Sequence, residues 1–214
     1  MTLIVIEGPD GSGKTTLAKQ LAVDAGFCYH RTPGQTSLGR MLRAIIKDTD
    51  RVAKATNYLT DQSHIEVSPN AAQLMMMVDL FDYNDQILSK MSDRCVVLDR
   101  IPLISGIIYG DAMGADVDLI RQLGPSLFSR QIDYLFILSS NDIDLLQSRV
   151  GMRDTVDLFE TDEIHRKTMH SYNSDFYNDE YFKKVLNGTK IARLDAALPT
   201  SQNIEKILND IKVR

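Results

Sequence analysis

Nine residues near the start of the chain, 8–16, have the types and spacing of a phosphate-binding loop. They fit the pattern G-x-x-x-x-G-K-T, directly after the apolar run 3–6 and at the start of a helical stretch. Such a loop points backbone N–H groups at an anion, while its lysine, here Lys14, reaches the β- and γ-phosphates of a nucleotide and its threonine, here Thr15, holds Mg²⁺. The alternative is a glycine-rich turn without a ligand. The residues expected around the phosphates are Gly8, Gly11, Ser12, Gly13, Lys14, Thr15 and Thr16.

Further charged residues follow other apolar runs, where a parallel sheet would place its ligand. Asp99 ends the run 94–98 and is suited to Mg²⁺, directly or through water, although an acid there could also be a cap at the end of the strand. Cations around a transferring phosphoryl group stabilise its charge, which favours a catalytic function over simple solvation for the arginines at this rim. These arginines are Arg31, Arg100, Arg149 and Arg153.

These residues need a fold that brings strand ends together. Short apolar runs alternate with helical periodicity, which predicts an α/β fold of three layers, a P-loop fold with a central five-stranded parallel sheet flanked by helices. The expected strands are 3–6, 27–30, 94–98, 134–138 and 190–194. The expected helices are 15–22, 37–46, 69–91, 102–112, 116–124, 142–149, 158–186 and 201–213. Residues 48–68 fit no element, and the segment of about 149–157 is expected to be a lid over the site.

Composition narrows the class of protein. The chain has 214 residues, 43% of them apolar, so we expect one domain over residues 1–214. A net charge of −5 argues against a broad surface for nucleic acid or anionic lipid. Cys28 and Cys95 form no C-x-x-C unit and are expected to be buried thiols. The chain begins without a basic leader and has no apolar run of about 18 residues, so we expect no membrane span and a cytoplasmic location.

Four blocks in this order resemble the thymidylate kinase family, the P-loop nucleoside monophosphate kinases that pass the γ-phosphoryl group of ATP to dTMP. Residues 6–16 resemble F-E-G-x-D-G-x-G-K-[ST]-T, and residues 31–43 resemble R-E-P-G-G-T-x-x-G-x-x-x-R. Asp99 and Arg100 resemble the pair that opens D-R-[YH]. The fourth block resembles the lid arginines and the D-R-x-E stretch before a tyrosine; it contains Arg149, Arg153, Asp157, Phe159, Glu160 and Tyr172.

The resemblance implies functions for particular residues. Asp10 would face the sugar of the monophosphate, and Arg31, Arg43 and Arg100 would hold its phosphate. The nucleotide-contacting positions of the family also include Met76, Tyr109 and Tyr172 of this chain. The resemblance further implies ATP and Mg²⁺ as cofactors and a homodimer formed through helices 37–47 and 71–91.

The base pocket departs from the family pattern. In L-L-F-A-A-D-R the phenylalanine stacks on thymine and the arginine contacts the monophosphate or base, but Met76 and Leu80 stand at those positions. Ile101 replaces the tyrosine or histidine after D-R, Thr32 replaces the glutamate of R-E-P, and the later Y-Q is Ile108 and Tyr109. The phosphate machinery is therefore retained while the pocket for the base has changed.

The sequence therefore predicts transfer of the ATP γ-phosphoryl group to a pyrimidine deoxynucleoside monophosphate, dTMP or a modified analogue, giving the diphosphate. Lys14, Arg100, Arg149 and Arg153 would be catalytic, and Thr15 and Asp99 would hold Mg²⁺. Two alternatives remain at this stage: a kinase for a nucleoside or for a base in DNA, and a nucleotide-binding regulator without catalysis. The negative charge speaks against nucleic acid as a partner.

Overall fold

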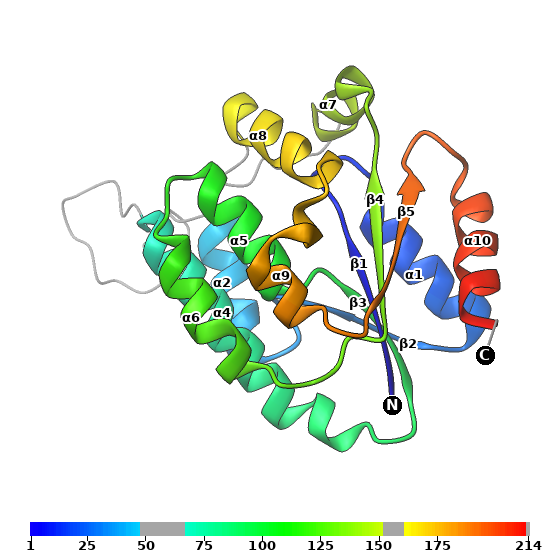
Figure 1. Ribbon diagram of the computed structural model, residues 1–214, viewed down its shortest axis with the longest axis horizontal. Coiled ribbons are helices and arrows are strands. Elements are labelled where there is room, and N and C mark those ends of the chain that lie inside the picture. Colours follow the sequence, from blue (N-terminus) through cyan, green and yellow to red (C-terminus); the bar gives the residue numbers. More distant parts are fainter. Residues whose placement is uncertain (48–66, 152–160, 213–214) are drawn as a thin grey trace.

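The centre of the molecule is one parallel sheet, seen in a computed structural model that describes residues 1–47, 67–151 and 161–212 (Figure 1). Its strands are β1 (Thr2–Glu7), β2 (Cys28–Arg31), β3 (Cys95–Asp99), β4 (Tyr134–Ser139) and β5 (Lys190–Asp195). They are hydrogen-bonded in the order β2-β3-β1-β4-β5, and every pairing is parallel. The predicted α/β class with five parallel strands is confirmed.

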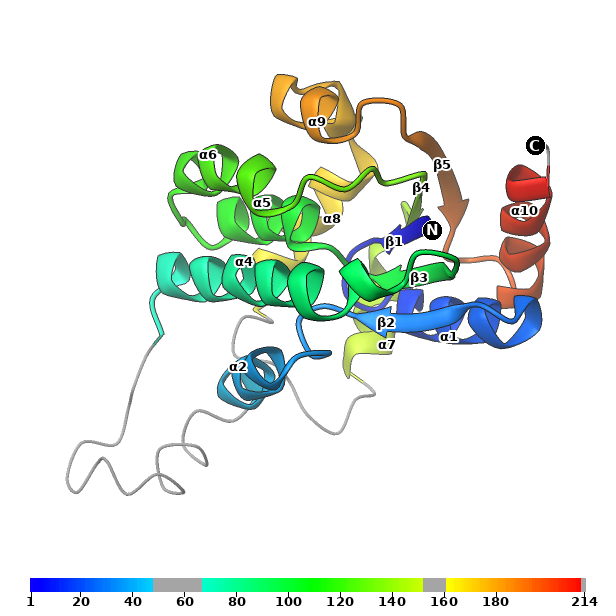
Figure 2. The same ribbon diagram turned by 90° about the horizontal axis from the view of Figure 1, so that it is seen from below.

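Helices cover both faces of the sheet, as expected of strands that read as continuous apolar runs. On one face lie α1 (Lys14–Ala25) and α10 (Thr200–Lys212), and on the other lie α4 (Pro69–Gln86), α5 (Pro102–Ala112), α6 (Val117–Leu127) and α9 (Glu180–Val185). The remaining helices are α2 (Ser37–Lys47), which packs against α4, and α7 (Ile143–Gly151) and α8 (Asp162–Asn173), which lie toward the carboxyl ends of the strands (Figures 1 and 2).

Alternation along β1 divides the core into two parts. Leu3 and Val5 point to the side of α4, α5 and α6, whereas Ile4 and Ile6 point to the side of α1 and α10. All four side chains are fully buried. Because successive residues of a strand face opposite sides, this one strand anchors both helical layers.

The predicted helix over 158–186 is wrong. Where the structure describes this stretch, α8 ends at Asn173, a short 3₁₀ turn spans Phe176–Asn178, and α9 begins at Glu180. The side chain of Asp179 accepts from the backbone N–H of Tyr181 and starts the new helix. Short polar side chains compete with helical hydrogen bonds in this way, and apolar periodicity alone does not reveal it.

Other helix ends also differ from the prediction. The helix beginning at Pro69 stops at Gln86 and continues to Lys90 only as a 3₁₀ turn. Thr36, one residue before α2, accepts from the backbone N–H of Gly39 and so caps that helix. Cys28 and Cys95 are free and partly buried rather than fully buried. Among the described residues, no helix combines the length and apolar character that crossing a bilayer requires.

Candidate functional site

The loop between β1 and α1 follows a backbone path that only glycine permits at two points. A Cβ on Gly8 would lie 2.1 Å from the carbonyl oxygen of Leu138, and one on Gly11 would lie 2.2 Å from that of Leu146. The loop is thus pressed against the end of β4 and against α7. Gly13, with φ of 88°, then turns the chain into α1, which leaves the first N–H groups of the helix directed at the loop.

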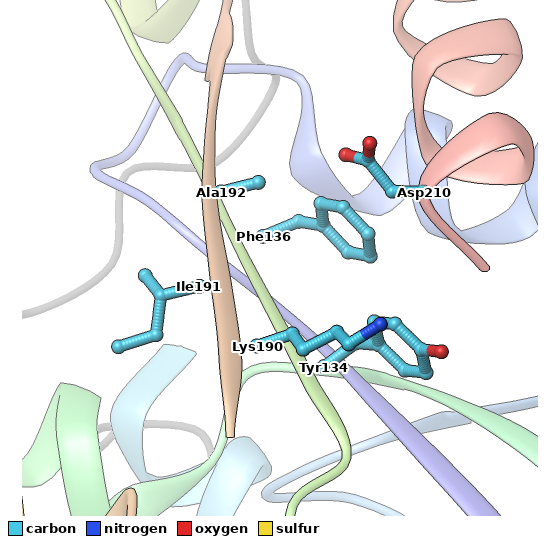
Figure 3. A pocket seen from close by; sticks show the side chains of 6 residues that line it. All are labelled: Tyr134, Phe136, Lys190, Ile191, Ala192 and Asp210. Atoms are coloured by element: carbon cyan, nitrogen blue, oxygen red, sulfur yellow. The ribbon is translucent and has the colours of Figure 1, made fainter. Parts of the chain in front are cut away.

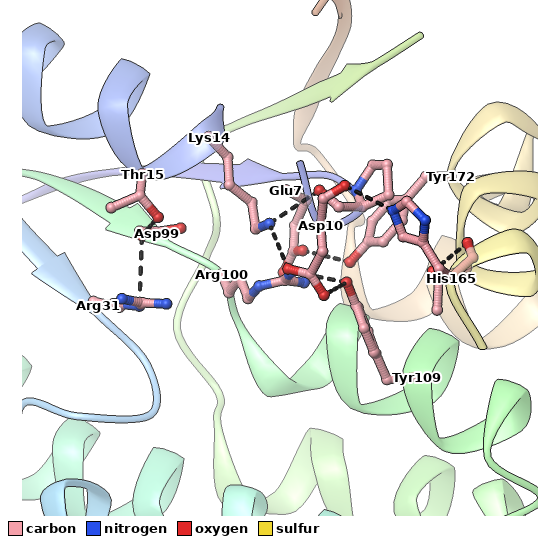
Figure 4. A network of polar contacts seen from close by, with 12 residues as sticks. Glu7, Asp10, Lys14, Thr15, Arg31, Asp99, Arg100, Tyr109, His165 and Tyr172 are labelled. Atoms are coloured by element: carbon pink, nitrogen blue, oxygen red, sulfur yellow. Dashed lines mark hydrogen bonds and ion pairs between the residues drawn. The ribbon is translucent and has the colours of Figure 1, made fainter. Parts of the chain in front are cut away.

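Asp10 joins the loop to the neighbouring strand end (Figure 4). Its Oδ1 lies 3.3 Å from Nζ of Lys14 and accepts from Nη2 of Arg100 at 2.7 Å. Its Oδ2 accepts from the hydroxyl of Tyr109 at 2.8 Å, and Arg100 also donates to that hydroxyl. The backbone carbonyl of Asp10 lies 3.0 Å from Nε2 of His165. One carboxylate therefore fixes both the loop lysine and the arginine after β3.

Glu7 is a buried acid next to this cluster (Figure 4). It is fully buried, and its carboxylate accepts from the backbone N–H of Ile101 at 2.7 Å and from the hydroxyl of Tyr172, also 2.7 Å away. Burial raises the pKa of Glu7, an effect that the charge of Arg100 and these two hydrogen bonds oppose. Arg100 itself has φ of 71°, a conformation that few non-glycine residues adopt. The bond to Ile101 holds the chain directly after this strained residue.

Asp99 forms a second cluster with Thr15, at the start of α1. The hydroxyl of Thr15 donates to its Oδ2 at 2.6 Å, the hydroxyl of Tyr29 lies 3.2 Å from the same oxygen, and Nε of Arg31 lies 3.7 Å away. The other oxygen, Oδ1, is buried and has no hydrogen-bond partner in the part of the chain that the structure describes. A carboxylate oxygen without a partner beside a threonine hydroxyl fits Mg²⁺, which is commonly bound through one carboxylate, a hydroxyl and phosphate oxygens. Within the described residues, no group of three or more acids, histidines or cysteines is arranged to hold a metal ion.

Lys14 is almost completely buried, and this affects its charge. Burial, and after it the nearby positive charge of Arg100, lower its pKa to about 8, although the carboxylates of Asp10, Asp99 and Glu7 oppose both effects. The lysine is therefore charged at neutral pH and loses its charge only in mildly alkaline solution. Burial also raises the pKa of Tyr109 well above its usual value, so this side chain is a neutral hydrogen-bonding group.

Helices α2 and α4 form the wall of the candidate site that lies beyond Arg31. The hydroxyl of Thr36 donates to the buried carboxylate of Asp79 at 2.5 Å, and Gly39 lies so close that an added Cβ would be 2.3 Å from that carboxylate. Arg43 donates to the carbonyl of Pro33 at 3.4 Å. These contacts fix the start of α2 against α4, and they place Arg43 beside the segment that follows Arg31.

The two residues of α4 that were predicted to lie at the base pocket differ in burial. Met76 is partly buried, whereas Leu80 has no exposed surface and belongs to the apolar core. Tyr172 is likewise fully buried, and its hydroxyl is bonded to Glu7.

A pocket of about 260 Å³ lies beside the loop, on the side of α10. Arg149 is in its wall and donates to the carbonyl of Ala196 at 3.0 Å. Residues of the loop, of α1, of the end of β4, and of α10 and the segment before it complete the lining: Ser12, Gly13, Thr16, Leu17, Leu138, Leu198, Thr200 and Asn203. A second pocket, shown in Figure 3, is lined by Tyr134 and Lys190 at the amino ends of β4 and β5 and contains none of the predicted site residues.

The structure thus brings together most of the predicted site residues that it describes. Arg153 lies outside the described residues, as do Asp157, Phe159 and Glu160. Glu7, Tyr29 and His165 were not predicted to take part. An acid at the end of an apolar strand was a usable signal for Glu7, but nothing near Tyr29 or His165 in the sequence indicated their partners.

A P-loop joined to arginines at the ends of neighbouring parallel strands is typical of enzymes that act on the phosphates of a nucleotide. The family model for thymidylate kinase matches residues 6–207. The chain belongs to the thymidylate kinase family, and the expected class of enzyme, a nucleoside monophosphate kinase, is confirmed.

Individual relatives agree with this assignment. A probable thymidylate kinase of Methanocaldococcus jannaschii is 28% identical over 210 residues, which cover 97% of this chain and 92% of the relative. One from Methanococcus aeolicus is 29% identical over 79% of this chain and 76% of its own length.

Two solved structures share the fold. The thymidylate kinase of Candida albicans superposes with a TM-score of 0.70 at 20% identity, covering 99% of this chain and 91% of that one. A deoxyadenosine kinase from M. mycoides gives 0.66 at 18% identity, with both chains fully covered.

Proposed function

We propose that this enzyme transfers the γ-phosphoryl group of ATP to dTMP. An oxygen of the dTMP phosphate attacks the γ-phosphorus, the bond from that phosphorus to the β–γ bridging oxygen breaks, and ADP and dTDP are released. The observation that carries this proposal is the shared carboxylate of Asp10, which contacts Lys14 on one side and Arg100 on the other. A donor-binding and an acceptor-binding cation are thus held at fixed separation, which lowers the entropic cost of bringing the substrates together.

The donor would bind along the loop. The backbone N–H groups of residues 10–16 and the ammonium of Lys14 would hold the phosphates, and the pocket beside Arg149 would take the rest of ATP. Arg149 and Arg153 would stabilise the charge on the transferring group, and the segment of about 149–157 would cover it. Arg149 lines this pocket together with Ser12 and Gly13 of the loop, which supports its proposed function at the donor.

The acceptor would bind at the cluster after β3. Nη1 of Arg100 is buried and has no hydrogen-bond partner within residues 1–47, 67–151 and 161–212, although Nη2 is paired with Asp10. Because Asp10 holds the guanidinium through Nη2, the Nη1 group is oriented and can donate a hydrogen bond to a phosphate oxygen. Arg31 and Arg43 would add charge to this subsite, and Asp10 with Tyr109 would face the sugar. Tyr172 would position Glu7 without touching the substrate.

Magnesium would bind between Thr15 and Asp99. When bound, it would neutralise charge on the β- and γ-phosphates. The orphaned Oδ1 of Asp99 and the Thr15 hydroxyl are the groups that would hold it, directly or through water.

The test is ADP release with ATP, Mg²⁺ and a panel of monophosphates and nucleosides. We expect turnover with dTMP, and loss of turnover in Lys14→Ala and in Arg153→Ala. Lys19→Ala, an exposed lysine on the same helix as Lys14, is the matched control and should retain activity. ADP release with a nucleoside but not with dTMP would overturn the proposed acceptor, and full activity in both site variants would overturn the proposed mechanism.

We also propose that residues 1–214 act as one domain and that the enzyme works in the cytoplasm, where ATP is supplied.

We further propose that two copies of the chain pair through α2 and α4. Large apolar side chains on these helices are about half exposed: Met41 at 52%, Val78 at 51% and Phe81 at 45%. A patch of this kind typically marks a protein interface. Sedimentation should give a dimer for the native chain and a monomer for Phe81→Glu; a native monomer would overturn the dimer.

A further inference from the structure

Gln73, in the second turn of α4, is a buried polar side chain without a partner. It has no exposed surface, and neither Oε1 nor Nε2 has a hydrogen-bond partner among the described residues. Buried amides are nearly always paired, because leaving one unpaired costs the free energy of its desolvation. A bound ligand can supply the missing partners.

The surroundings of Gln73 leave room for its amide. Oε1 lies 3.4 Å from where a Cβ would stand on Gly106, and its Cγ lies 3.3 Å from the corresponding point on Gly110. These glycines, four residues apart on α5, let that helix come close to the glutamine. The same helix carries Tyr109, which bonds to Asp10 and Arg100. The amide is thus next to the helix that bears part of the proposed acceptor site.

The family pattern L-L-F-A-A-D-R ends in an arginine that contacts the monophosphate or the base, but this chain has no charged side chain at that position. Leu80 stands there, fully buried in the apolar core. Gln73 lies two turns earlier on nearly the same face of α4, since seven residues correspond to about two turns of helix. An amide there can replace a guanidinium as a neutral hydrogen-bonding group.

We propose that Gln73 determines the base specificity of this enzyme by pairing with the N3–C4 edge of the thymine ring. Its carbonyl oxygen accepts from N3–H, and its NH₂ group donates to the C4 carbonyl oxygen, so both orphaned atoms are satisfied at once. The inference rests on the proposed function, because it assigns the base-reading residue of the proposed acceptor site.

The experiment compares dTMP with its N3-methyl analogue, which lacks the N3–H donor. The native enzyme should discriminate against the analogue by about 10- to 100-fold in kcat/KM, because the amide is left unpaired. In Gln73→Met, which has a similar length, KM for dTMP should rise by a similar factor while KM for ATP stays constant, and the discrimination should disappear. Gln86→Met is the matched control, the same change at an exposed position of the same helix.

Two further readouts separate this function from a structural one. Without substrate, Gln73→Met should melt at the same or a higher temperature than the native protein, because the unpaired amide is removed. If the variant fails to fold, Gln73→Leu takes its place. Calorimetric titration with dTMP and its analogue reports the base preference independently of turnover.

The outcomes distinguish the two proposals. Turnover of dTMP with equal discrimination in the native enzyme and Gln73→Met would overturn the function of Gln73 alone. Binding of dTMP that depends on Gln73, without ATP-dependent turnover, would overturn the proposed reaction alone. A native protein that binds dTMP and its N3-methyl analogue equally well would also overturn the inference about Gln73.

Discussion

The carboxylate of Asp10 lies 2.7 Å from the guanidinium of Arg100, although 90 positions separate the two residues in the chain. Because β1 and β3 are neighbours, with Ile6 opposite Asp99, the loop after one strand meets the residue after the other. The contact couples the two ends of the proposed reaction, since the same carboxylate also contacts Lys14.

Asp10→Asn should weaken both subsites. A neutral amide pairs less strongly with Lys14 and Arg100, and charge-assisted bonds of this kind are worth about 1.5–3 kcal/mol, so kcat/KM for dTMP should fall by roughly 10- to 100-fold. Steady-state kinetics with dTMP varied will measure this. Asp24→Asn, at an exposed site on α1, is the control. Equal kinetics for the two variants would contradict the coupling.

The activity should depend on pH through Lys14. Burial is the largest cause that lowers its pKa to about 8, and the ammonium is charged below that value. The kcat/KM for ATP should therefore be maximal below pH 8 and fall by about tenfold per pH unit above it. Asp10→Asn removes an influence that raises this pKa and should shift the alkaline limb to lower pH. A pH profile that stays flat to alkaline values would show that Lys14 is not so perturbed.

Tyr172→Phe should destabilise the protein. The change removes one of two hydrogen bonds to the buried carboxylate of Glu7, which should cost about 1.5–3 kcal/mol in the free energy of unfolding. Urea unfolding will measure the loss. The control is Tyr177→Phe, which removes a hydroxyl bonded to the exposed carboxylate of Asp175 and should change stability by less than about 0.5 kcal/mol. The same loss in both variants would contradict a special function for Glu7.

Thr15→Val should raise the Mg²⁺ concentration needed for half-maximal activity. Valine has the shape of threonine but cannot bond to Asp99 or bind a cation, so we expect an increase of about tenfold or more. Thr15→Ser keeps the hydroxyl and should retain most of the native Mg²⁺ response. If valine and serine behave alike in a Mg²⁺ titration, the hydroxyl does not contribute to the metal site.

Some elements could be predicted because their causes are local. The phosphate-binding loop depends on glycines at fixed spacing, and the strands depend on short apolar runs between turns. The predicted helix over 158–186 was wrong because the apolar periodicity continues past the end of α8. The side chain of Asp179 caps a new helix there, and periodicity does not reveal a cap. Periodicity identifies which face of a helix is buried, but it does not show where the hydrogen bonds of the backbone end.

The sequence by itself determined the phosphate loop, the parallel sheet and the set of charged residues at the strand ends, since each follows from residue types a few positions apart. Only the tertiary structure decided which charges meet. The pairing of Asp10 with Arg100, the hydrogen bond between the buried Glu7 and Tyr172 and the unpartnered amide of Gln73 all depend on strand order and helix packing. The physical reason is that strand order and helix packing are set by burial of the whole apolar surface, and no short stretch of sequence contains that information.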